Sequence, residues 1–291
     1  MRYFLVALAL TPIAIDAGAS ENSIPVRQRV SAEIQKMRQA KPPSRSSGTL
    51  RDGRLEIPAE LPKPDGIGYF VSHPDRDTNF GADRMVFGLM RLGLAMHERL
   101  GPEPHHRVLI NEISDRDGGK QKRHINHQMG LDVDLGLYAI DLEGNPVHAR
   151  WLKFDEDGLS PKKKLRFDAE RNWVLLESII ENETFGEIRA VLLANWLKKK
   201  LLAHAEALAA EAEGAEAKRL KSLIRRAEEL VRQPESSPHD THFHLSLLAE
   251  DTAYTITCSQ PAEKPGSSPG YGSRRNPPLS TAFVTESGVM P

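Results

Sequence analysis

The stretch RHINHQMGLDVDLGLY (residues 123–138) decides how the rest of this chain is interpreted. Polar and aliphatic residues alternate in its second half, with Asp132 and Asp134 at one parity and aliphatic residues at the other. Such alternation is typical of a strand with one face in the core, because successive side chains point to opposite faces. The sequence therefore predicts a strand over residues 132–138 that carries both carboxylates on one face.

A second stretch, HDTHFHLSL (residues 239–247), has the same period of two. His242, His244 and Ser246 share one parity, and an aromatic and two aliphatic residues share the other. Two strands that each carry polar groups on one face form the floor of a polar cleft if they lie side by side. We expect these two strands to pair.

The two stretches together indicate a metal site. Zinc binds imidazole nitrogen and carboxylate oxygen, and catalytic zinc sites use three protein ligands and one open position. His127, Asp134 and His244 fill that set, which predicts one zinc ion per chain. Either pattern alone is also compatible with histidines that only decorate a surface or a core, but their joint occurrence favours the metal.

Several motifs carry a resemblance to a known family. SxxxGG precedes HxxHQxGLDVD, and HxxHFH follows about a hundred residues later; GIGYFVSHPDRDTNFG (66–81) and FDAERNW (167–173) complete the set. From about Gly48 to Cys258 the chain resembles the penicillin-insensitive murein endopeptidases of Gram-negative periplasms. That family belongs to a wider group of lysostaphin-type, D-alanyl-D-alanine carboxypeptidase and hedgehog-like metal domains.

The resemblance implies a fold and a reaction. The expected fold is α+β, hedgehog/DD-peptidase-like, with a small antiparallel sheet that carries the zinc site and is flanked by helices. The expected reaction is hydrolysis of the D-alanyl–meso-diaminopimelyl cross-link between peptidoglycan peptide stems. A zinc hydrolase needs no active-site serine, so β-lactams that acylate serine are not expected to inhibit it.

Roles for four further residues follow partly from the resemblance. Strand parity places His242 beside the metal, and the family's corresponding histidine acts as base or transition-state stabiliser. His124 and His239 match family histidines that line the cleft; they orient water, stabilise an oxyanion, bind substrate or serve structure, and the sequence does not choose. Asp132 either orients a metal-ligating histidine or is solvated.

Two alternatives to the endopeptidase stay open. One is a D-alanyl-D-alanine carboxypeptidase of the same group, which would trim terminal D-alanine. The other is a domain that binds zinc and cell-wall fragments without catalysis. The presence of His242 weighs against the second, because a binding module needs no base.

Composition and the first residues indicate the compartment. The net charge of −1 over 291 residues implies no general attraction to nucleic acid or membranes. Arg2, an apolar run over 3–15 and the small residues 17–19 predict a signal peptide (1–19), which would place the protein in the periplasm. A buried first strand is the alternative. No later segment is apolar enough to span a membrane, and oligomeric state is left open.

The rest of the chain divides as follows. Residues 20–47 are expected to form a polar N-terminal segment and linker, residues 48–259 the zinc metallopeptidase domain, and residues 260–291 a disordered Pro/Ser/Gly-rich tail. The single cysteine, Cys258, cannot form an intrachain disulfide.

Local patterns predict the remaining elements. The expected helices are Val30–Gln39, Asp83–Leu100, Ala169–Glu181 with Asp168 as its N-cap, a helix capped by Asn195 and running through Ala210, and Lys218–Arg232. The expected strands are 54–57 and 107–114, with a hairpin turn over 141–145. Residues 185–194 fit either a strand or a helix, and the resemblance favours a strand.

Overall fold

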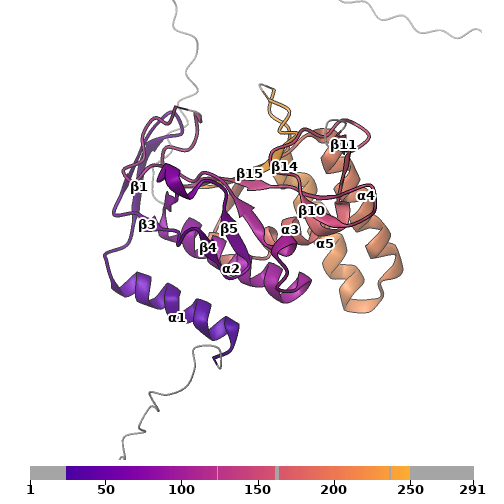
Figure 1. Cartoon of the computed structure of the whole chain (residues 1–291), viewed down its shortest axis with the longest axis horizontal. Coiled ribbons are helices and arrows are strands. Elements are labelled where there is room, and N and C mark those ends of the chain that lie inside the picture. Colours follow the sequence, from indigo (N-terminus) through magenta and orange to yellow (C-terminus); the bar gives the residue numbers. More distant parts are fainter. Residues whose placement is uncertain (1–23, 123, 161–163, 236, 250–291) are drawn as a thin grey trace, which may run out of the picture. The chain divides into compact units, whose positions relative to one another are not determined.

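Short strands alternate with five α-helices in the part of the chain that this computed structural model describes, residues 24–122, 124–160, 164–235 and 237–249 (Figure 1). The helices are α1 Val26–Gln39, α2 Asp83–Leu100, α3 Ala169–Ile180, α4 Asn195–Glu211 and α5 Gly214–Leu230. The predicted signal peptide, the predicted C-terminal tail and Cys258 lie outside the described residues.

The strands are β1 Arg45–Thr49, β2 Asp52–Glu56, β3 Ala59–Glu60, β4 Asp65–Gly66, β5 Tyr69–Val71, β6 Phe80–Gly81, β7 Val108–Ile110, β8 Asp132–Gly136, β9 Tyr138–Ile140, β10 Pro146–His148, β11 Leu159–Ser160, β12 Leu165–Phe167, β13 Ile188–Leu192, β14 Val231–Arg232 and β15 His242–Leu247. Three short 3₁₀ helices, η2 Pro74–Arg76, η3 Pro104–His106 and η4 Glu183–Phe185, complete these elements. The mixed α+β class predicted from the sequence is confirmed. The hedgehog-like likeness of the fold stays a prediction.

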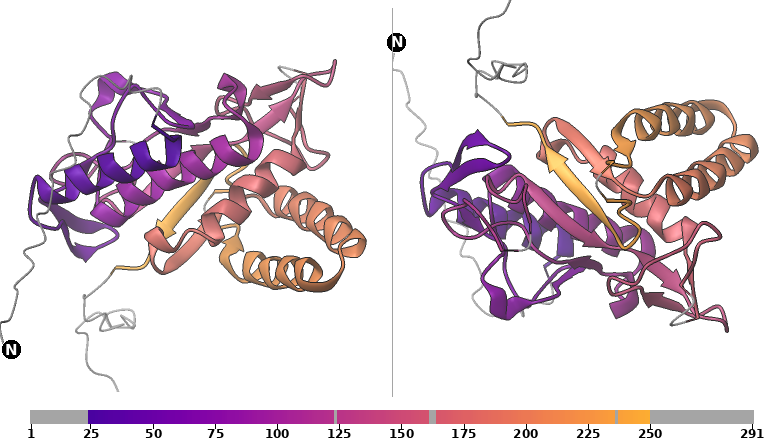
Figure 2. Two further views of the ribbon diagram at one scale, coloured as in Figure 1. Left: turned by 90° about the horizontal axis from the view of Figure 1, so that it is seen from below. Right: turned by 90° about the horizontal axis from the view of Figure 1, so that it is seen from above.

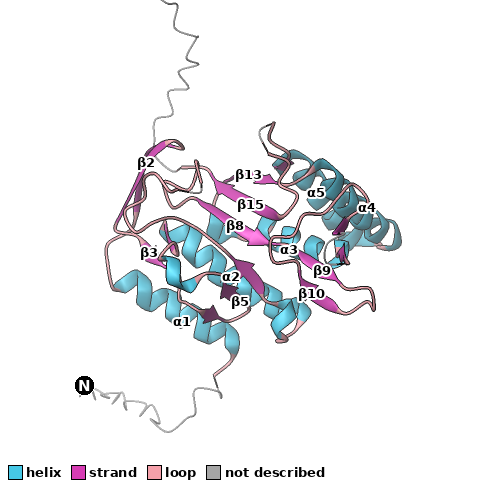
Figure 3. Ribbon diagram, turned by 45° about the horizontal axis from the view of Figure 1, so that its top comes forward, coloured by secondary structure: helices cyan, strands magenta, loops and turns pink. Residues whose placement is uncertain are grey.

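A seven-stranded sheet with the order β14-β13-β15-β8-β7-β5-β4 forms the centre (Figure 3). The prediction of a small antiparallel sheet is wrong in two respects, because this sheet is large and mixed. Its middle strands pair antiparallel, but β13 pairs parallel with β14, and β5 pairs parallel with β7. Parallel neighbours need a long crossover; α4 and α5 connect the first pair, and α2 connects the second.

The two motif strands lie side by side, as the alternation predicted. In the antiparallel pair of β8 and β15, His244 is opposite Asp134, Ser246 is opposite Asp132, and His242 is opposite Gly136. Every residue of β8 is buried, so this strand is not half-exposed. The polar face is buried because the site's own side chains and the loop before β8 cover it.

Helices cover the aliphatic face of the sheet. Seen from below, α1, α2 and α3 lie in front of the sheet, and seen from above, β8 and β15 are in front (Figure 2). Val133, Leu135 and Phe243 share one hydrophobic core with the buried residues of α2 and α3. The polar face that carries the site therefore looks away from these helices.

The strand predicted over 132–138 breaks into two. β8 ends at Gly136, and Tyr138 begins β9, which belongs to a four-stranded sheet of order β10-β9-β12-β11. A Cβ on Gly136 would lie 2.6 Å from Leu109 Cδ2, so the close packing of β7 on β8 requires glycine here. The predicted hairpin turn is confirmed, since the Asp141 amide donates to the Asn145 carbonyl between β9 and β10.

Two helices match their predictions, and a third begins earlier than predicted. α2 has the expected bounds, and the Asp168 carboxylate accepts the Arg171 amide at 3.0 Å as the N-cap of α3. α1 begins at Val26, four residues before the predicted start. Pro25 immediately precedes it, and its carbonyl accepts the Gln28 and Arg29 amides as the first hydrogen bonds of the helix.

The predicted strand over 107–114 is shorter than expected. β7 ends at Ile110, and the Asn111 amide then donates to the Asp134 carbonyl. The strand predicted over 54–57 spans 52–56, since Ile57 has a positive φ of 52°. Residues 185–194 do contain the expected strand, β13.

The helical hairpin of α4 and α5 needs two corrections. Asn195 is not a cap: Ala194 holds the cap position, and the Asn195 amide donates to the Gln233 side chain. α5 begins at Gly214, not Lys218, and ends at Leu230, because Val231 and Arg232 pair with β13. Figure 2 shows α4 and α5 packed side by side. None of the described helices is long and apolar enough to cross a membrane.

Candidate functional site

Strand pairing brings His244 and Asp134 into direct contact. The two residues are cross-strand partners, so their side chains rise from the same face of the sheet. His244 Nδ1 lies 2.9 Å from Asp134 Oδ1, and both residues are buried. The sequence predicted that both residues belong to one metal site, and the strand register supplies the contact.

His127 reaches the same point from the loop before β8. Its Nδ1–H donates to the Ile113 carbonyl at 2.8 Å, which leaves the Nε2 lone pair directed at the site. His127 Nε2 lies 3.4 Å from Asp134 Oδ1 and 3.4 Å from His244 Nδ1. The ring is fully buried, so it has one orientation.

The three ligand atoms fit a tetrahedral metal ion. His127 Nε2, Asp134 Oδ1 and His244 Nδ1 form a triangle with edges of 2.9, 3.4 and 3.4 Å. Bonds of 2.0–2.1 Å in a tetrahedral zinc site place ligand atoms about 3.3 Å apart. These residues can therefore hold a zinc ion without rearrangement of the strands. Two further groups, each sharing at least one residue with this triangle, have ligand atoms within 4.8 Å of one another and could also hold a metal. They are His239 with His242 and His244, and His124 with His127 and Asp134.

Asp132 holds the other side of the His244 ring. Its Oδ1 lies 3.1 Å from His244 Nε2 and also accepts the Ser246 hydroxyl at 2.6 Å. Asp132 is fully buried, so the solvated alternative is excluded. A hydrogen bond from Nε2–H to Asp132 leaves Nδ1 with the lone pair that a metal requires.

The electrostatics of this cluster favour positive charge. Burial disfavours a charged His244, but its hydrogen bonds to Asp132 and Asp134 outweigh burial and raise its pKa to about 9. Burial also opposes a charged Asp134, yet the charge of His127 and hydrogen bonds from the surrounding imidazoles hold its pKa well below the ordinary value. The carboxylates of Asp132 and Asp134 are thus both buried beside the His244 ring.

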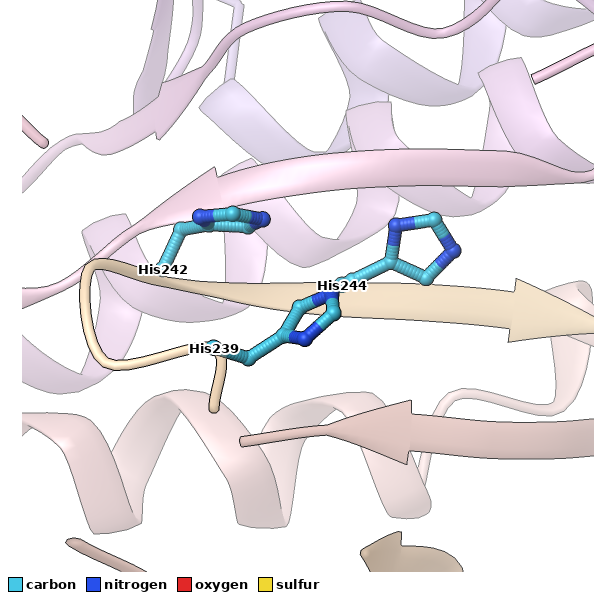
Figure 4. Close-up of side chains that lie close together, drawn as sticks. All are labelled: His239, His242 and His244. Atoms are coloured by element: carbon cyan, nitrogen blue, oxygen red, sulfur yellow. The ribbon is translucent and has the colours of Figure 1, made fainter. Parts of the chain in front are cut away.

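His242 begins β15 and lies at the open edge of the cluster. Its Nε2 is 3.4 Å from Asp134 Oδ1, and its Nδ1 is 2.7 Å from the Thr241 hydroxyl. About a fifth of its side chain is exposed, a larger fraction than for His127, Asp134 or His244. Figure 4 shows His242 and His244 rising from the same strand, as their shared parity predicted.

His239 comes from the segment that leads into β15 (Figure 4). Its Nδ1–H donates to the Ser237 carbonyl at 3.2 Å, and its ring centre lies 5.2 Å from that of His242 and 5.8 Å from that of His244. Burial lowers its pKa. His239 has a positive φ of 51°, a conformation that costs energy for a residue with a side chain.

His124 leads to a residue that the sequence analysis missed. Its Nδ1 is 3.5 Å from Asp134 Oδ2, and its Nε2 contacts the buried carboxylate of Glu112. Arg76 pairs with the other oxygen of Glu112 at 2.9 Å. Burial and the neighbouring His127 lower the pKa of His124. A carboxylate within the apolar run of VLINEIS was the signal that could have indicated Glu112.

Trp151 is a second residue that the sequence did not indicate. Its ring packs edge-on against His242 with ring centres 5.6 Å apart, and its indole N–H donates to the Ser72 hydroxyl at 3.4 Å. The loop residue has a positive φ of 66°. No pattern around position 151 signals this contact, because it depends on how the loop folds back.

Residues 46–172 match the family model described as penicillin-insensitive murein endopeptidase. The matched segment contains His124, His127, Asp132 and Asp134 and ends before β15. No curated protein matches the chain. Over residues 46–172, the resemblance of this chain to the penicillin-insensitive murein endopeptidases is thereby confirmed.

Proposed function

We propose that this protein is a zinc-dependent endopeptidase that cleaves the D-alanyl–meso-diaminopimelyl cross-links of peptidoglycan. The observation that carries the proposal is the triangle of His127 Nε2, Asp134 Oδ1 and His244 Nδ1. Two of these three residues lie within the segment that matches a family of murein endopeptidases.

In this proposal, His127, Asp134 and His244 hold one zinc ion per chain. When bound, zinc supplies a Lewis acid that activates water and polarises a carbonyl group. The chain supports the ligands from behind: the Ile113 carbonyl fixes the His127 ring, and Asp132 fixes the His244 ring. Such outer partners set both the tautomer and the direction of a ligating imidazole.

His242 is the proposed general base. When its Nδ1–H donates to the Thr241 hydroxyl, its Nε2 carries a lone pair beside the Asp134 carboxylate. That nitrogen can accept a proton from water and return it to the leaving amine. Partial exposure of His242 gives a substrate access to the same atom.

His239 and His124 each lie beside a residue of the proposed zinc site, His239 beside His244 and His124 beside Asp134. The bond from His239 Nδ1–H to Ser237 leaves its Nε2 free to accept a hydrogen bond. His124 is held by Glu112 and reaches Asp134 from the side of the loop before β8. We propose that both line the substrate cleft, with His239 facing the β15 side.

The proposed compartment is the periplasm, which contains the substrate. The family match supports a cell-wall substrate, and the order of Arg2, an apolar run and small residues at 17–19 supports export. The proposed mechanism uses no serine nucleophile, so we expect cleavage to continue in the presence of penicillin.

Purified muropeptides test the reaction. The zinc-loaded protein should convert cross-linked dimers into monomers, with products identified by mass spectrometry. Conversion of pentapeptides into tetrapeptides without loss of dimers would instead assign a D-alanyl-D-alanine carboxypeptidase. Full zinc binding without cleavage of any peptidoglycan peptide would assign a wall-binding domain.

The variant His242→Ala tests the base. It should retain zinc, because three ligands remain, and lose about 10²–10⁴-fold in turnover. His204→Ala, which removes a histidine from α4 outside the site, is the matched control and should cut at the wild-type rate. Near wild-type turnover by a zinc-loaded His242→Ala protein would exclude His242 as the base.

A further inference from the structure

A β-bulge interrupts the pairing of β13 with β15 next to the site. Ile188 pairs with Leu247, and Ala190 pairs with Ser246, so two steps on β13 match one step on β15. Arg189 is the extra residue. Bulges redirect a side chain relative to a regular strand and occur next to active sites.

The bulge directs Arg189 onto the polar face of the sheet. In a regular strand, Arg189 would point opposite to Ala190, toward the apolar face. Instead, its guanidinium donates twice to the Ser246 hydroxyl, from Nε at 3.0 Å and from Nη2 at 2.6 Å. Ser246 is fully buried, so this contact is protected from water.

Ser246 passes the contact on to Asp132. Its hydroxyl accepts from Arg189 and donates to Asp132 Oδ1 at 2.6 Å, and the same oxygen lies 3.1 Å from His244 Nε2. The four side chains therefore form one hydrogen-bond network, in which Ser246 and His244 both donate to Asp132 Oδ1 and Arg189 donates to Ser246. The other nitrogen of the His244 ring lies beside Asp134.

The buried negative charge of Asp132 explains why an arginine, Arg189, belongs to this network. Asp132 is fully buried, and a buried carboxylate is costly unless it is paired. Among the described residues, Arg189 is the one arginine or lysine within 4 Å of Asp132, with Nη2 at 3.6 Å from Oδ1. Arg189 can therefore offset the carboxylate charge without displacing the hydrogen bond to His244.

We propose that Arg189 and Ser246 are positioning residues for the zinc site. They hold the Asp132 carboxylate in the orientation that accepts Nε2–H of His244, which directs Nδ1 of His244 at the metal. This inference rests on the zinc site of the proposed function but not on its substrate. It assigns the bulge to ligand orientation and not only to sheet packing.

Zinc affinity is the direct readout. Arg189→Leu removes the guanidinium and keeps an aliphatic side chain, and a competing chelator measures the zinc dissociation constant. Loss of an outer partner of a metal ligand typically weakens binding about 10–100-fold, and we expect that range. Arg189→Lys, which retains a donor and a charge, should recover part of the affinity.

A matched control separates positioning from sheet stability. Arg232→Leu makes the same chemical change on the neighbouring strand β14, where the arginine side chain is exposed. It should leave zinc affinity unchanged. Because Arg189→Leu leaves the buried Asp132 carboxylate without its arginine, its metal-free form should melt below the wild type, so zinc affinity is measured at a temperature at which circular dichroism shows both proteins folded. Equal zinc affinity in Arg189→Leu and Arg232→Leu would overturn the proposal.

A double-variant cycle tests whether the residues act as one chain. Ser246→Ala should weaken zinc binding to a similar extent as Arg189→Leu. Because Arg189 acts through Ser246, the double variant should be little weaker than Ser246→Ala alone. Fully additive losses would contradict the claim that Arg189 acts through Ser246.

The outcomes distinguish this inference from the proposed function. If the wild type binds zinc but cuts no peptidoglycan peptide, the proposed function fails, while weaker zinc binding by Arg189→Leu still supports the positioning role. If the wild type cleaves muropeptide dimers and Arg189→Leu binds zinc with wild-type affinity, the function stands and the positioning role fails.

Discussion

Two regions of the molecule bury ionisable side chains, and the two regions differ in the hydrogen-bond partners that surround those side chains. At the start of α3, Arg171 donates to the Asp168 carboxylate at 2.6 Å and to the carbonyls of His105, Ala139 and Val147 at 2.8, 2.5 and 3.3 Å. Each of these contacts joins an N–H donor to an oxygen acceptor. The Arg171 region is therefore complete without any further partner.

At the site on β8 and β15, several imidazoles share one carboxylate oxygen instead. Asp134 Oδ1 has nitrogens of His127, His242 and His244 within 3.4 Å, and no arginine or lysine pairs with Asp134 among the described residues. A matched set of donors and acceptors indicates a structural role. Imidazole and carboxylate groups that converge on one small volume, each able to bind a metal, indicate a place for a cation.

The largest expected effect comes from removing the Asp134 carboxylate at the centre of the site. Asp134→Ala removes the oxygen that all three imidazoles share, so zinc binding should be lost and turnover should fall by at least about 10³-fold, since the metal contributes several kcal/mol to catalysis. Zinc should raise the melting temperature of the wild type but not of this variant, because metal binding is linked to folding.

The control for this variant is Asp141→Ala, which removes a partly exposed carboxylate from the β9–β10 hairpin. It should keep both the zinc response and the activity. A zinc-dependent rise in melting temperature that survives in Asp134→Ala would show that the cluster does not hold the metal through this oxygen.

The next largest effect concerns the matched region. Arg171→Met leaves Asp168 and three carbonyls without their donor, and loss of one partner of a buried charge pair costs about 3–5 kcal/mol of unfolding free energy. Urea unfolding measures the loss. The folded fraction should bind zinc with wild-type affinity, because Arg171 makes no contact with the site. Arg166→Met, on the exposed side of β12, should cost little.

The smallest effect concerns a histidine near the Arg171 region. The His148 ring packs against Phe70 and Tyr138, and burial lowers its pKa to about 4. Between the unfolded pKa of about 6.5 and the folded value, the unfolded chain binds more protons. Stability should therefore fall as pH drops from 6.5 to 4, by up to about 3 kcal/mol from this group.

The variant His148→Gln isolates that contribution, since glutamine can still donate to the Pro104 carbonyl, the acceptor of His148 Nε2. Once other groups cancel, the unfolding free energy of the wild type should fall more than that of the variant between pH 7 and pH 4.5. A difference that does not change with pH would show that His148 is protonated equally in both states.

Much of the site could be predicted from the sequence because its determinants are local. Alternation in two short stretches placed Asp132 and Asp134 on one face of their strand, and His242 and His244 on one face of theirs. Pairing of β8 with β15 then puts all four residues on the same face of the sheet. The bounds of α2 followed from its apolar period and the Gly101 stop. These features depend on neighbours in the chain.

The features that were missed depend on distant segments. Glu112 meets His124 because the chain leaves β7 at Ile110, and Trp151 meets His242 because a loop folds back. The bulge at Arg189 is a register shift between two strands more than fifty residues apart, and no local period encodes it. Parallel pairing at β14 likewise required knowledge of the α4–α5 crossover.

The zinc content of the purified chain tests the central claim most directly. After equilibration with zinc and removal of free metal, elemental analysis by mass spectrometry should find one zinc per wild-type chain. The variant with His127, Asp134 and His244 all changed to alanine should hold none, with circular dichroism to verify its fold. One zinc per chain in that triple variant, or none in the wild type, would contradict the account.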